Sequence, residues 1–271
     1  MNVLIYSNKS KDCDGEIIKS LLSELDLYNI SHELISASDL NSKKQADAIF
    51  VLGGDGTLLL VNEFANKNNI PLIGINTGKL GFLSEFESYE ISDAVKLFNN
   101  GELKEDKRIA IEVICDGKSY IGLNDVYVQR FFSEDIDSIL AFITIKAEGS
   151  EIFSSKGDGI VISTPTGSTA YSLSAGGSIL TPGVDAFILT PISAHSLSQR
   201  PIVYKANAEF EVVVNSDVCV GVFVDGKCIS KLSKGKKFIV KKADNSTVFF
   251  RKKDFNFFNR LRLKFNGDTR A

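Results

Sequence analysis

The residues best suited to chemistry lie in four short stretches of this 271-residue chain. The first, Gly53-Gly54-Asp55-Gly56-Thr57, separates an apolar run ending at Leu52 from a helical pattern that starts near Leu58. Glycines let the backbone turn sharply, and free N–H groups at the start of a helix suit a phosphate. Asp55 would repel that phosphate unless it bound a metal or accepted a proton, and both roles belong to phosphoryl transfer. An Asp-Gly turn without chemistry is the alternative.

The second stretch runs from Asn76 to Leu83 and follows another apolar run, Pro71 to Ile75. Ligands of open parallel sheets bind beyond the carboxyl ends of the strands, so this loop could share a crevice with the first stretch. A purely structural loop fits the residues equally well.

The third stretch is Leu123-Asn124-Asp125-Val126, where two polar residues interrupt a strand-like run. Such residues are costly to bury without partners, so they need a partner or a ligand. An amide beside a carboxylate could hydrogen-bond the two hydroxyls of a ribose. A bulge or turn at the edge of a sheet is the alternative.

The fourth stretch opens with Lys156-Gly157-Asp158-Gly159 and continues, after an apolar run, from Thr164 to Gly177. Its small, hydroxylated and glycine residues bury little apolar area, but they supply donors around a polar ligand. A flexible linker is the alternative. His195, further along, fits a structural histidine better than a catalyst, and Asp225-Gly226 predicts only a hairpin turn.

The surrounding pattern predicts two domains that position these stretches. In the first third, apolar runs alternate with helical patterns, which favours a parallel, Rossmann-like α/β domain over residues 1–105. Short strand-like runs then dominate, which indicates a mostly-β domain over 106–250 and a tail over 251–271. The strand-like runs are Ile109 to Val113, Tyr120 to Val128, Leu140 to Ile145, Ile160 to Thr164, Ala186 to Thr190, Glu209 to Val214, Val218 to Val224, Phe238 to Lys242 and Thr247 to Phe250.

Composition excludes several classes of protein. A formal net charge of −3 gives no basic field for nucleic acid. The locally basic tail from Arg251 to Lys264 fits a solvated face whose phenylalanines pack inward. Four scattered cysteines, the absence of a signal-peptide pattern and the absence of a long apolar run predict a soluble cytoplasmic protein without a membrane partner.

Taken in order, the four stretches closely resemble bacterial NAD kinases. The glycine turn around Asp55 also occurs in diacylglycerol and sphingosine lipid kinases and, more loosely, in phosphofructokinases. The pair Asn124-Asp125 and the run Thr164-Pro165-Thr166-Gly167-Ser168-Thr169-Ala170-Tyr171 narrow the likeness to NAD kinases. The resemblance extends from Val3 to about Phe250. It implies an α/β domain followed by a β-rich domain, NAD bound between them, and a homodimer or homotetramer.

The resemblance also implies an activity and a set of roles. The activity is transfer of a phosphoryl group from ATP to the 2′-hydroxyl of the adenosine ribose of NAD, giving NADP. Asp55 would accept the hydroxyl proton, and a divalent cation, Mg²⁺, would be held through the substrate phosphates rather than by protein ligands. The residues expected to contact NAD are Asp55, Gly56, Phe82, Asn124, Asp125, Lys156, Asp158, Thr166, Thr169, Ala170, Tyr171, Ser172, Leu173 and Ser174.

Two positions depart from the family pattern. Ser178 stands where relatives usually have proline, and Asp125 where many have the longer glutamate.

Two other functions compete with that of an NAD kinase. A lipid kinase would need a membrane-facing surface, for which only residues 251–264 are a candidate. A non-catalytic NAD sensor would not need Asp55. Because relatives with a charged residue at the position of Lys156 tend to prefer NAD, the resemblance implies NAD rather than NADH as the better substrate. The identity of the phosphoryl donor, ATP or polyphosphate, stays open.

Overall fold

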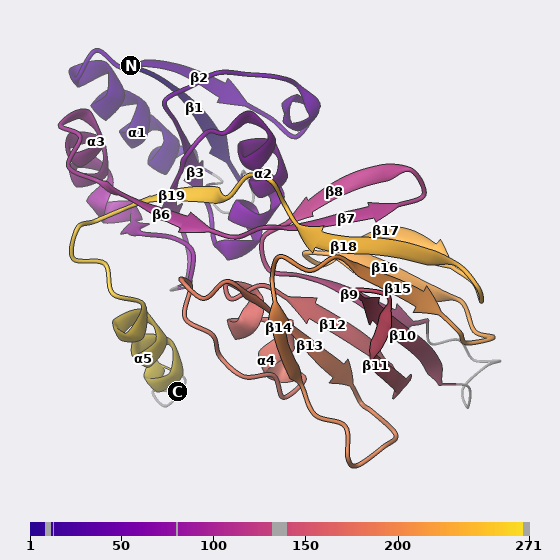
Figure 1. The fold of residues 1–271 in the computed structure, drawn as a ribbon. Coiled ribbons are helices and arrows are strands. Elements are labelled where there is room, and N and C mark those ends of the chain that lie inside the picture. The colour runs from indigo at the N-terminus through magenta and orange to yellow at the C-terminus, as the bar shows by residue number, and fades with distance from the viewer. Residues whose placement is uncertain (9–11, 13, 80, 132–139, 268–271) are drawn as a thin grey trace. The chain divides into compact units, whose positions relative to one another are not determined.

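The structure is a computed structural model that describes residues 1–8, 12, 14–79, 81–131 and 140–267 (Figure 1). The chain forms two compact units. Unit 1 combines residues 1–108 with residues 247–271, and unit 2 consists of residues 109–246. The C-terminal residues therefore belong with the N-terminal ones, whereas the sequence had assigned the strand at 247–250 to the second domain and the remainder to a separate tail.

Unit 1 is built on a seven-stranded sheet with the order β2-β1-β3-β4-β19-β6, in which β5 also pairs with β4. Strands β2, β1, β3 and β4 are mutually parallel. Its strands are β1 (Asn2–Ser7), β2 (Ser31–Ile35), β3 (Ala48–Leu52), β4 (Leu72–Asn76), β5 (Phe86–Glu87), β6 (Lys104–Arg108) and β19 (Thr247–Arg251). Its helices are α1 (Glu16–Leu27), α2 (Asp55–Asn68), α3 (Ile91–Asn99) and α5 (Phe257–Gly267).

The central strands of unit 1 follow from the apolar pattern. Every residue of β3 and of β4 is buried, as expected for parallel strands covered on both faces. In α1 the buried residues Leu21 and Leu25 are four positions apart and so lie on one face. The parallel α/β prediction is confirmed, but α2 begins at Asp55 rather than near Leu58, because the glycine turn leads directly into the helix.

Strand β19 corrects the sequence prediction. It is yellow in Figure 1 and lies among the indigo and violet strands of the N-terminal sheet. Phe249 pairs with Leu72 of β4 on one side and with Asp106 of β6 on the other. The residues of β19 identified a strand correctly, but an apolar pattern carries no information about which sheet a strand joins.

Unit 2 contains two six-stranded sheets, and every pairing in them is antiparallel. One sheet has the order β11-β10-β15-β18-β7-β8 and the other β14-β13-β12-β9-β16-β17. The strands are β7 (Ile111–Cys115), β8 (Lys118–Gly122), β9 (Asp125–Arg130), β10 (Ala141–Ala147), β11 (Ser150–Gly157), β12 (Gly159–Ser163), β13 (Ala186–Ile192), β14 (Ile202–Lys205), β15 (Phe210–Val214), β16 (Val220–Val224), β17 (Lys227–Leu232) and β18 (Lys237–Lys242), with one short helix, α4 (Tyr171–Ser174).

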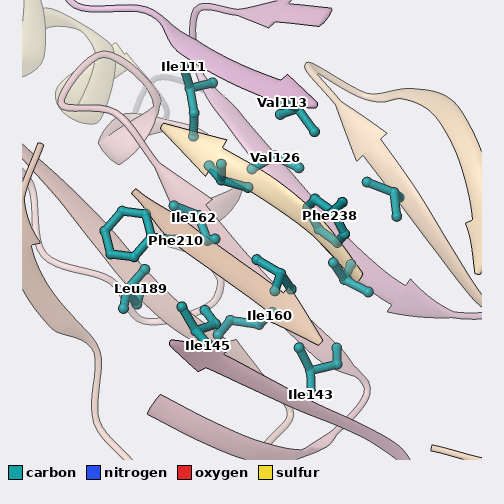
Figure 2. Close-up of a cluster of buried hydrophobic side chains, with 14 of the residues drawn as sticks. Ile111, Val113, Val126, Ile143, Ile145, Ile160, Ile162, Leu189, Phe210 and Phe238 are labelled. Carbon is teal, nitrogen blue, oxygen red and sulfur yellow. The ribbon is translucent and has the colours of Figure 1, made fainter. Parts of the chain in front are cut away.

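The two sheets of unit 2 share one hydrophobic core. Figure 2 shows Ile143 and Phe238, from the first sheet, in the same cluster as Val126 and Ile162, from the second. Alternating inward-facing apolar residues are typical of such a sandwich. The prediction of a β-rich second region is confirmed.

One predicted strand of unit 2 is wrong. The run Tyr120 to Val128 is not a single returning strand, because β8 ends at Gly122 and β9 starts at Asp125 in the other sheet. The polar residues of the third stretch mark this change of sheet. Asp116 and Gly117 form the hairpin turn between β7 and β8, with positive φ of 50° and 73°. Strands β11, β14 and β17 were not foreseen at all. Across the helices that the structure describes, none is both long and apolar enough to cross a membrane.

Candidate active site

Asp55 is the first residue of α2 and directly follows the glycine turn after β3. Its carboxylate accepts the backbone N–H of Phe82 at 2.8 Å and that of Leu83 at 3.0 Å, one on each oxygen. The first two stretches therefore meet, which was one of the two alternatives that the sequence left open, although Leu80 lies outside the described residues. Each carboxylate oxygen has a second lone pair, so a carboxylate oriented in this way can still accept a proton.

The loop packs so closely on Asp55 that it requires a glycine. A Cβ atom at Gly81 would lie 2.1 Å from Oδ1 of Asp55, far inside van der Waals contact. Gly78, in the same loop, has open space at the corresponding position. The spacing of the second stretch thus serves to place backbone N–H groups and a bare Cα against the Asp55 carboxylate.

The third stretch is held by a residue that the sequence had identified only as part of a turn. The carboxylate of Asp225 accepts three backbone N–H groups, from Leu123 at 2.7 Å, Asn124 at 2.8 Å and Asp125 at 3.1 Å. Asp225 has φ of 46° in the turn between β16 and β17. The Asp-Gly signal predicted that turn, but no local pattern could show which backbone the carboxylate would reach.

The fourth stretch holds the same backbone segment by donating hydrogen bonds to its carbonyl groups. The hydroxyl of Thr164 donates to the carbonyl oxygen of Leu123 at 2.6 Å, and the Thr164 N–H donates to that of Asn124 at 2.8 Å. A Cβ atom at Gly167 would lie 2.1 Å from the Asn124 carbonyl oxygen. These buried, specific contacts rule out the flexible-linker alternative for this segment.

Asp125 is in an unusual electrostatic position. Its residue is 4% exposed, and burial together with the nearby charge of Asp225 raises its pKa to about 8. Burial and the charge of Asp125 in turn raise the pKa of Tyr127. The pKa of Tyr171 is also raised, by burial and by the charges of Asp158 and Asp125. A carboxyl group in this position keeps its proton near neutral pH and can donate a hydrogen bond as well as accept one.

The two tyrosines whose pKa values Asp125 raises make close ring contacts. Tyr127 stacks on Phe223 with ring centroids 4.6 Å apart and meets Tyr171 edge-on at 5.0 Å. Such faces suit the flat, partly apolar surface of a nucleoside.

The other predicted NAD contacts of unit 2 differ in their surroundings. Asp158 accepts the Nε–H of Arg130 at 2.8 Å, so Arg130 is a further residue that sequence reasoning missed. Lys156 is exposed, with its Nζ 5.0 Å from the centroid of the Phe142 ring. Ser172 is fully buried, and its hydroxyl is 2.9 Å from that of Thr190, which makes it the least available of the set.

The remaining predicted contacts are less enclosed. Thr166 is buried and its carbonyl accepts the Thr169 hydroxyl at 3.2 Å. The half-buried positions are Phe82, Thr169, Ala170, Tyr171 and Leu173, and the exposed ones are Gly56 and Ser174. The candidate residues thus fall into two groups, those of unit 1, which include Asp55, and those of unit 2, which include Asp125.

The described residues offer little for a metal ion to bind without help from a substrate. Within the described part of the chain, no three His, Cys, Asp or Glu side chains are grouped so as to hold a cation. Mg²⁺ commonly binds through one or two carboxylates together with substrate phosphates, and the carboxylates of this site are compatible with that arrangement.

Comparison with characterised families gives a consistent result. Residues 16–103 match the ATP-NAD kinase N-terminal domain, and residues 123–252 match the ATP-NAD kinase C-terminal domain. An NAD kinase from Chloroherpeton thalassium is 37% identical over 231 residues, covering 83% of this chain and 80% of the relative. An NAD kinase from Heliobacterium modesticaldum is 38% identical, covering 82% and 79%.

Solved structures agree with the sequence matches. Yeast NADH kinase complexed with NADH superimposes with a TM-score of 0.83 at 26% identity, covering 98% of this chain and 88% of its own. An NAD kinase from Archaeoglobus fulgidus in complex with ATP gives a TM-score of 0.78 at 23% identity, covering 98% of both chains, and supports the fold.

Proposed function

The chain belongs to the NAD kinase family, and from that premise we propose that Asp55 is its catalytic base and that Asn124 and Asp125 bind the ribose of its substrate. The enzyme transfers a phosphoryl group from ATP to the 2′-hydroxyl of the adenosine ribose of NAD, giving NADP and ADP. The observation that carries the proposal is the Asp55 carboxylate, oriented by two backbone N–H groups at the start of α2.

The chemistry required of Asp55 is modest. A ribose hydroxyl is a poor nucleophile while it keeps its proton. As the bond from the 2′-oxygen to the γ-phosphorus forms and the bond to the ADP oxygen breaks, the proton passes to an oxygen of Asp55. The donors from Phe82 and Leu83 keep that oxygen in place, which limits the entropy lost in reaching the reactive geometry.

Asn124 and Asp125 have a binding role in this proposal. Their backbone is fixed by Asp225 and by Thr164, so the two side chains are presented without a large cost of ordering. With a pKa of about 8, the Asp125 carboxyl group can donate one hydrogen bond to a ribose oxygen and accept another from a hydroxyl. The aromatic faces of Tyr127 and Tyr171 would contact the nucleoside.

A divalent cation completes the proposal. Mg²⁺, bound through the ATP phosphates, would neutralise charge that develops on the transferring group. Carboxylates are the protein groups that could help to bind this cation, and a complete set of protein ligands is not needed.

NADH is a second candidate substrate, because the superimposed yeast enzyme was solved as an NADH kinase with NADH. We favour NAD on the family resemblance, since relatives with a charged residue at the position of Lys156 tend to prefer NAD. Comparing kcat/KM for the two substrates tests this. Equal values would contradict the preference.

The assembly and location are also proposals. We propose a homodimer or homotetramer in the cytoplasm, on the family resemblance and on the scattered cysteines. Light scattering that finds only a monomer at working concentration would contradict the oligomer.

The direct test of function is to incubate purified enzyme with NAD, ATP and Mg²⁺ and to measure NADP. Product should require all three components. Full turnover in excess chelator would contradict the role of the cation, and turnover of a lipid substrate instead of NAD would contradict the function itself.

A further inference from the structure

The loop that holds Asp55 is itself held from its other side by the C-terminal part of unit 1. Phe82 and Leu83 donate their N–H groups to Asp55. The carbonyl oxygen of Leu83 accepts a hydrogen bond from Nη1 of Arg251 at 2.6 Å, and that of Ser84 accepts one from Nη2 of Arg260 at 3.0 Å. Leu83 is therefore bonded to Asp55 through its N–H and to Arg251 through its carbonyl.

Arg251 is an unusual residue to find in the core of this unit. Its side chain is fully buried at the end of β19. Its Nε lies 3.2 Å from Oδ2 of Asp106, and its Nη1 lies 3.4 Å from Oε2 of Glu85. Burial lowers the pKa of the guanidinium to about 10, so it remains charged at neutral pH.

Stability of the fold is a weak reason for such a residue. Buried ion pairs recover little more than the cost of removing the charges from water, and apolar residues of similar volume often serve as well. Here the guanidinium also lies near the rings of Phe249 and Phe255, 4.9 and 4.6 Å from their centroids, in a setting that an apolar side chain could fill. An apolar residue alone could supply neither the hydrogen bond to Leu83 nor the partner of the Asp106 and Glu85 carboxylates.

We propose that Arg251 is a positioning residue for catalysis, and that it acts by holding the Leu83 backbone so that the N–H groups at 82 and 83 orient the Asp55 carboxylate. This inference rests on the proposed role of Asp55 as the base. Arg260 supports the same loop one residue further on, from α5. The C-terminal segment thereby contributes to the reaction without touching a substrate.

A double-mutant cycle tests the inference, because residues that act through one another are not additive. The variants are Arg251→Met, Asp55→Asn and the two combined, each measured for kcat, KM for NAD and thermal midpoint. Arg251→Met should lower kcat roughly 10- to 100-fold, the usual effect of misplacing a catalytic group by about 1 Å. In the Asp55→Asn background the same change should lower kcat by less than about threefold, since there is no base left to misplace.

Two further variants guard against a simple loss of folding. Arg260→Met removes the less buried of the two arginines and should lower kcat with a smaller change in the thermal midpoint. Arg262→Met, exposed on the same helix, is the control and should leave kcat unchanged.

The outcomes separate this inference from the proposed function. If Asp55→Asn loses activity but Arg251→Met lowers kcat equally in both backgrounds, or not at all in the wild type, the positioning role is overturned and the base remains. If Asp55→Asn keeps a near-normal kcat, the proposed base is wrong and the inference is overturned with it. If Arg251→Met does not fold, Arg260→Met decides by the same comparison in the two backgrounds.

Discussion

At the scale of single residues, the two proposed site carboxylates have opposite surroundings. Asp55 is half-buried and its oxygens accept two backbone N–H groups. Asp125 is buried beside another carboxylate, and its pKa is raised to about 8 by burial and by the charge of Asp225. Environments that differ in this way commonly divide two carboxyl groups between different roles.

Substitution of each carboxylate should therefore affect a different kinetic parameter. Asp55→Asn keeps the shape and removes the base, so kcat should fall roughly 10²–10⁴-fold with little change in KM for NAD. Asp125→Ala removes a hydrogen bond to bound substrate, so KM should rise roughly 10- to 100-fold. Steady-state kinetics measure both. A near-normal kcat for Asp55→Asn together with abolished turnover for Asp125→Ala would reverse the roles.

The raised pKa of Asp125 also predicts a dependence of stability on pH. The folded state holds this proton up to about pH 8, whereas the unfolded chain releases it near the ordinary value of 3.8. The stability that the proton contributes is complete below pH 3.8 and is lost as pH rises to about 8. Across this window the free energy of unfolding of the wild type should therefore fall, relative to that of Asp125→Asn, by on the order of 1 kcal/mol per pH unit.

The measurement is the thermal midpoint of both proteins from pH 5 to pH 9. The thermal midpoint of Asp125→Asn, relative to that of the wild type, should rise with pH up to about pH 8 and stay constant above it. If the difference in thermal midpoint stays constant over the range, Asp125 is ionised in the folded protein, because a group that is ionised in both the folded and the unfolded state adds no pH dependence.

At the scale of elements, the site depends on loops that approach one another closely. A Cβ atom at Gly81 would meet Oδ1 of Asp55 at 2.1 Å, while one at Gly78 would meet nothing within 4 Å. Gly81→Ala should displace the carboxylate or the loop and lower kcat roughly 10- to 100-fold. Gly78→Ala, three residues away in the same loop, should keep near-normal kcat, and equal losses in the two variants would contradict the close approach.

The sequence predicted the elements better than their partners. The apolar run of β3 and the glycines after it identified a strand, a turn and a helix, because those signals are local. The link between Asp225 and the backbone at 123–125 joins residues about a hundred positions apart, so no local pattern could reveal it. A local pattern likewise could not reveal the bond between Arg130, at the end of β9, and Asp158, which lies between β11 and β12.

Prediction failed in particular where the chain changes sheet. Tyr120 to Val128 has a continuous strand-like composition, yet the backbone passes from one sheet to the other at Leu123 and Asn124. The interruption by polar residues was visible, but its two explanations, a ligand site and a break in the strand, could not be separated without the fold.

At the scale of the whole molecule, unit 2 is inserted into unit 1 at two neighbouring positions. Arg108, at the end of β6, pairs with Thr247, at the start of β19, in an antiparallel register. The ends of the insertion therefore lie side by side in the sheet, at a spacing that a two-residue hairpin turn spans.

This predicts that unit 1 can be made as one short chain. Residues 1–108 joined to residues 247–267 by Asn-Gly should fold, because the linker turns β6 directly into β19. Residues 1–108 alone should not fold stably, because β6 would lose the strand that joins it to the sheet. Circular dichroism and cooperative thermal unfolding distinguish the two. A folded 1–108 fragment would mean that β19 is dispensable.

The insertion also has a consequence for how the protein is made. Translation delivers β4 and β6 early, but the strand that lies between them in the sheet emerges only after all of unit 2. At roughly 5–20 residues per second, the nascent chain waits on the order of ten seconds with the start of β4, at Leu72, as an open sheet edge, while Ile75 and Asn76 pair with β5. Such an edge is a template for pairing with other chains. The half of the enzyme that carries Asp55 is thus the last to be completed on the ribosome, and slow translation of residues 109–246 should raise its demand for chaperones.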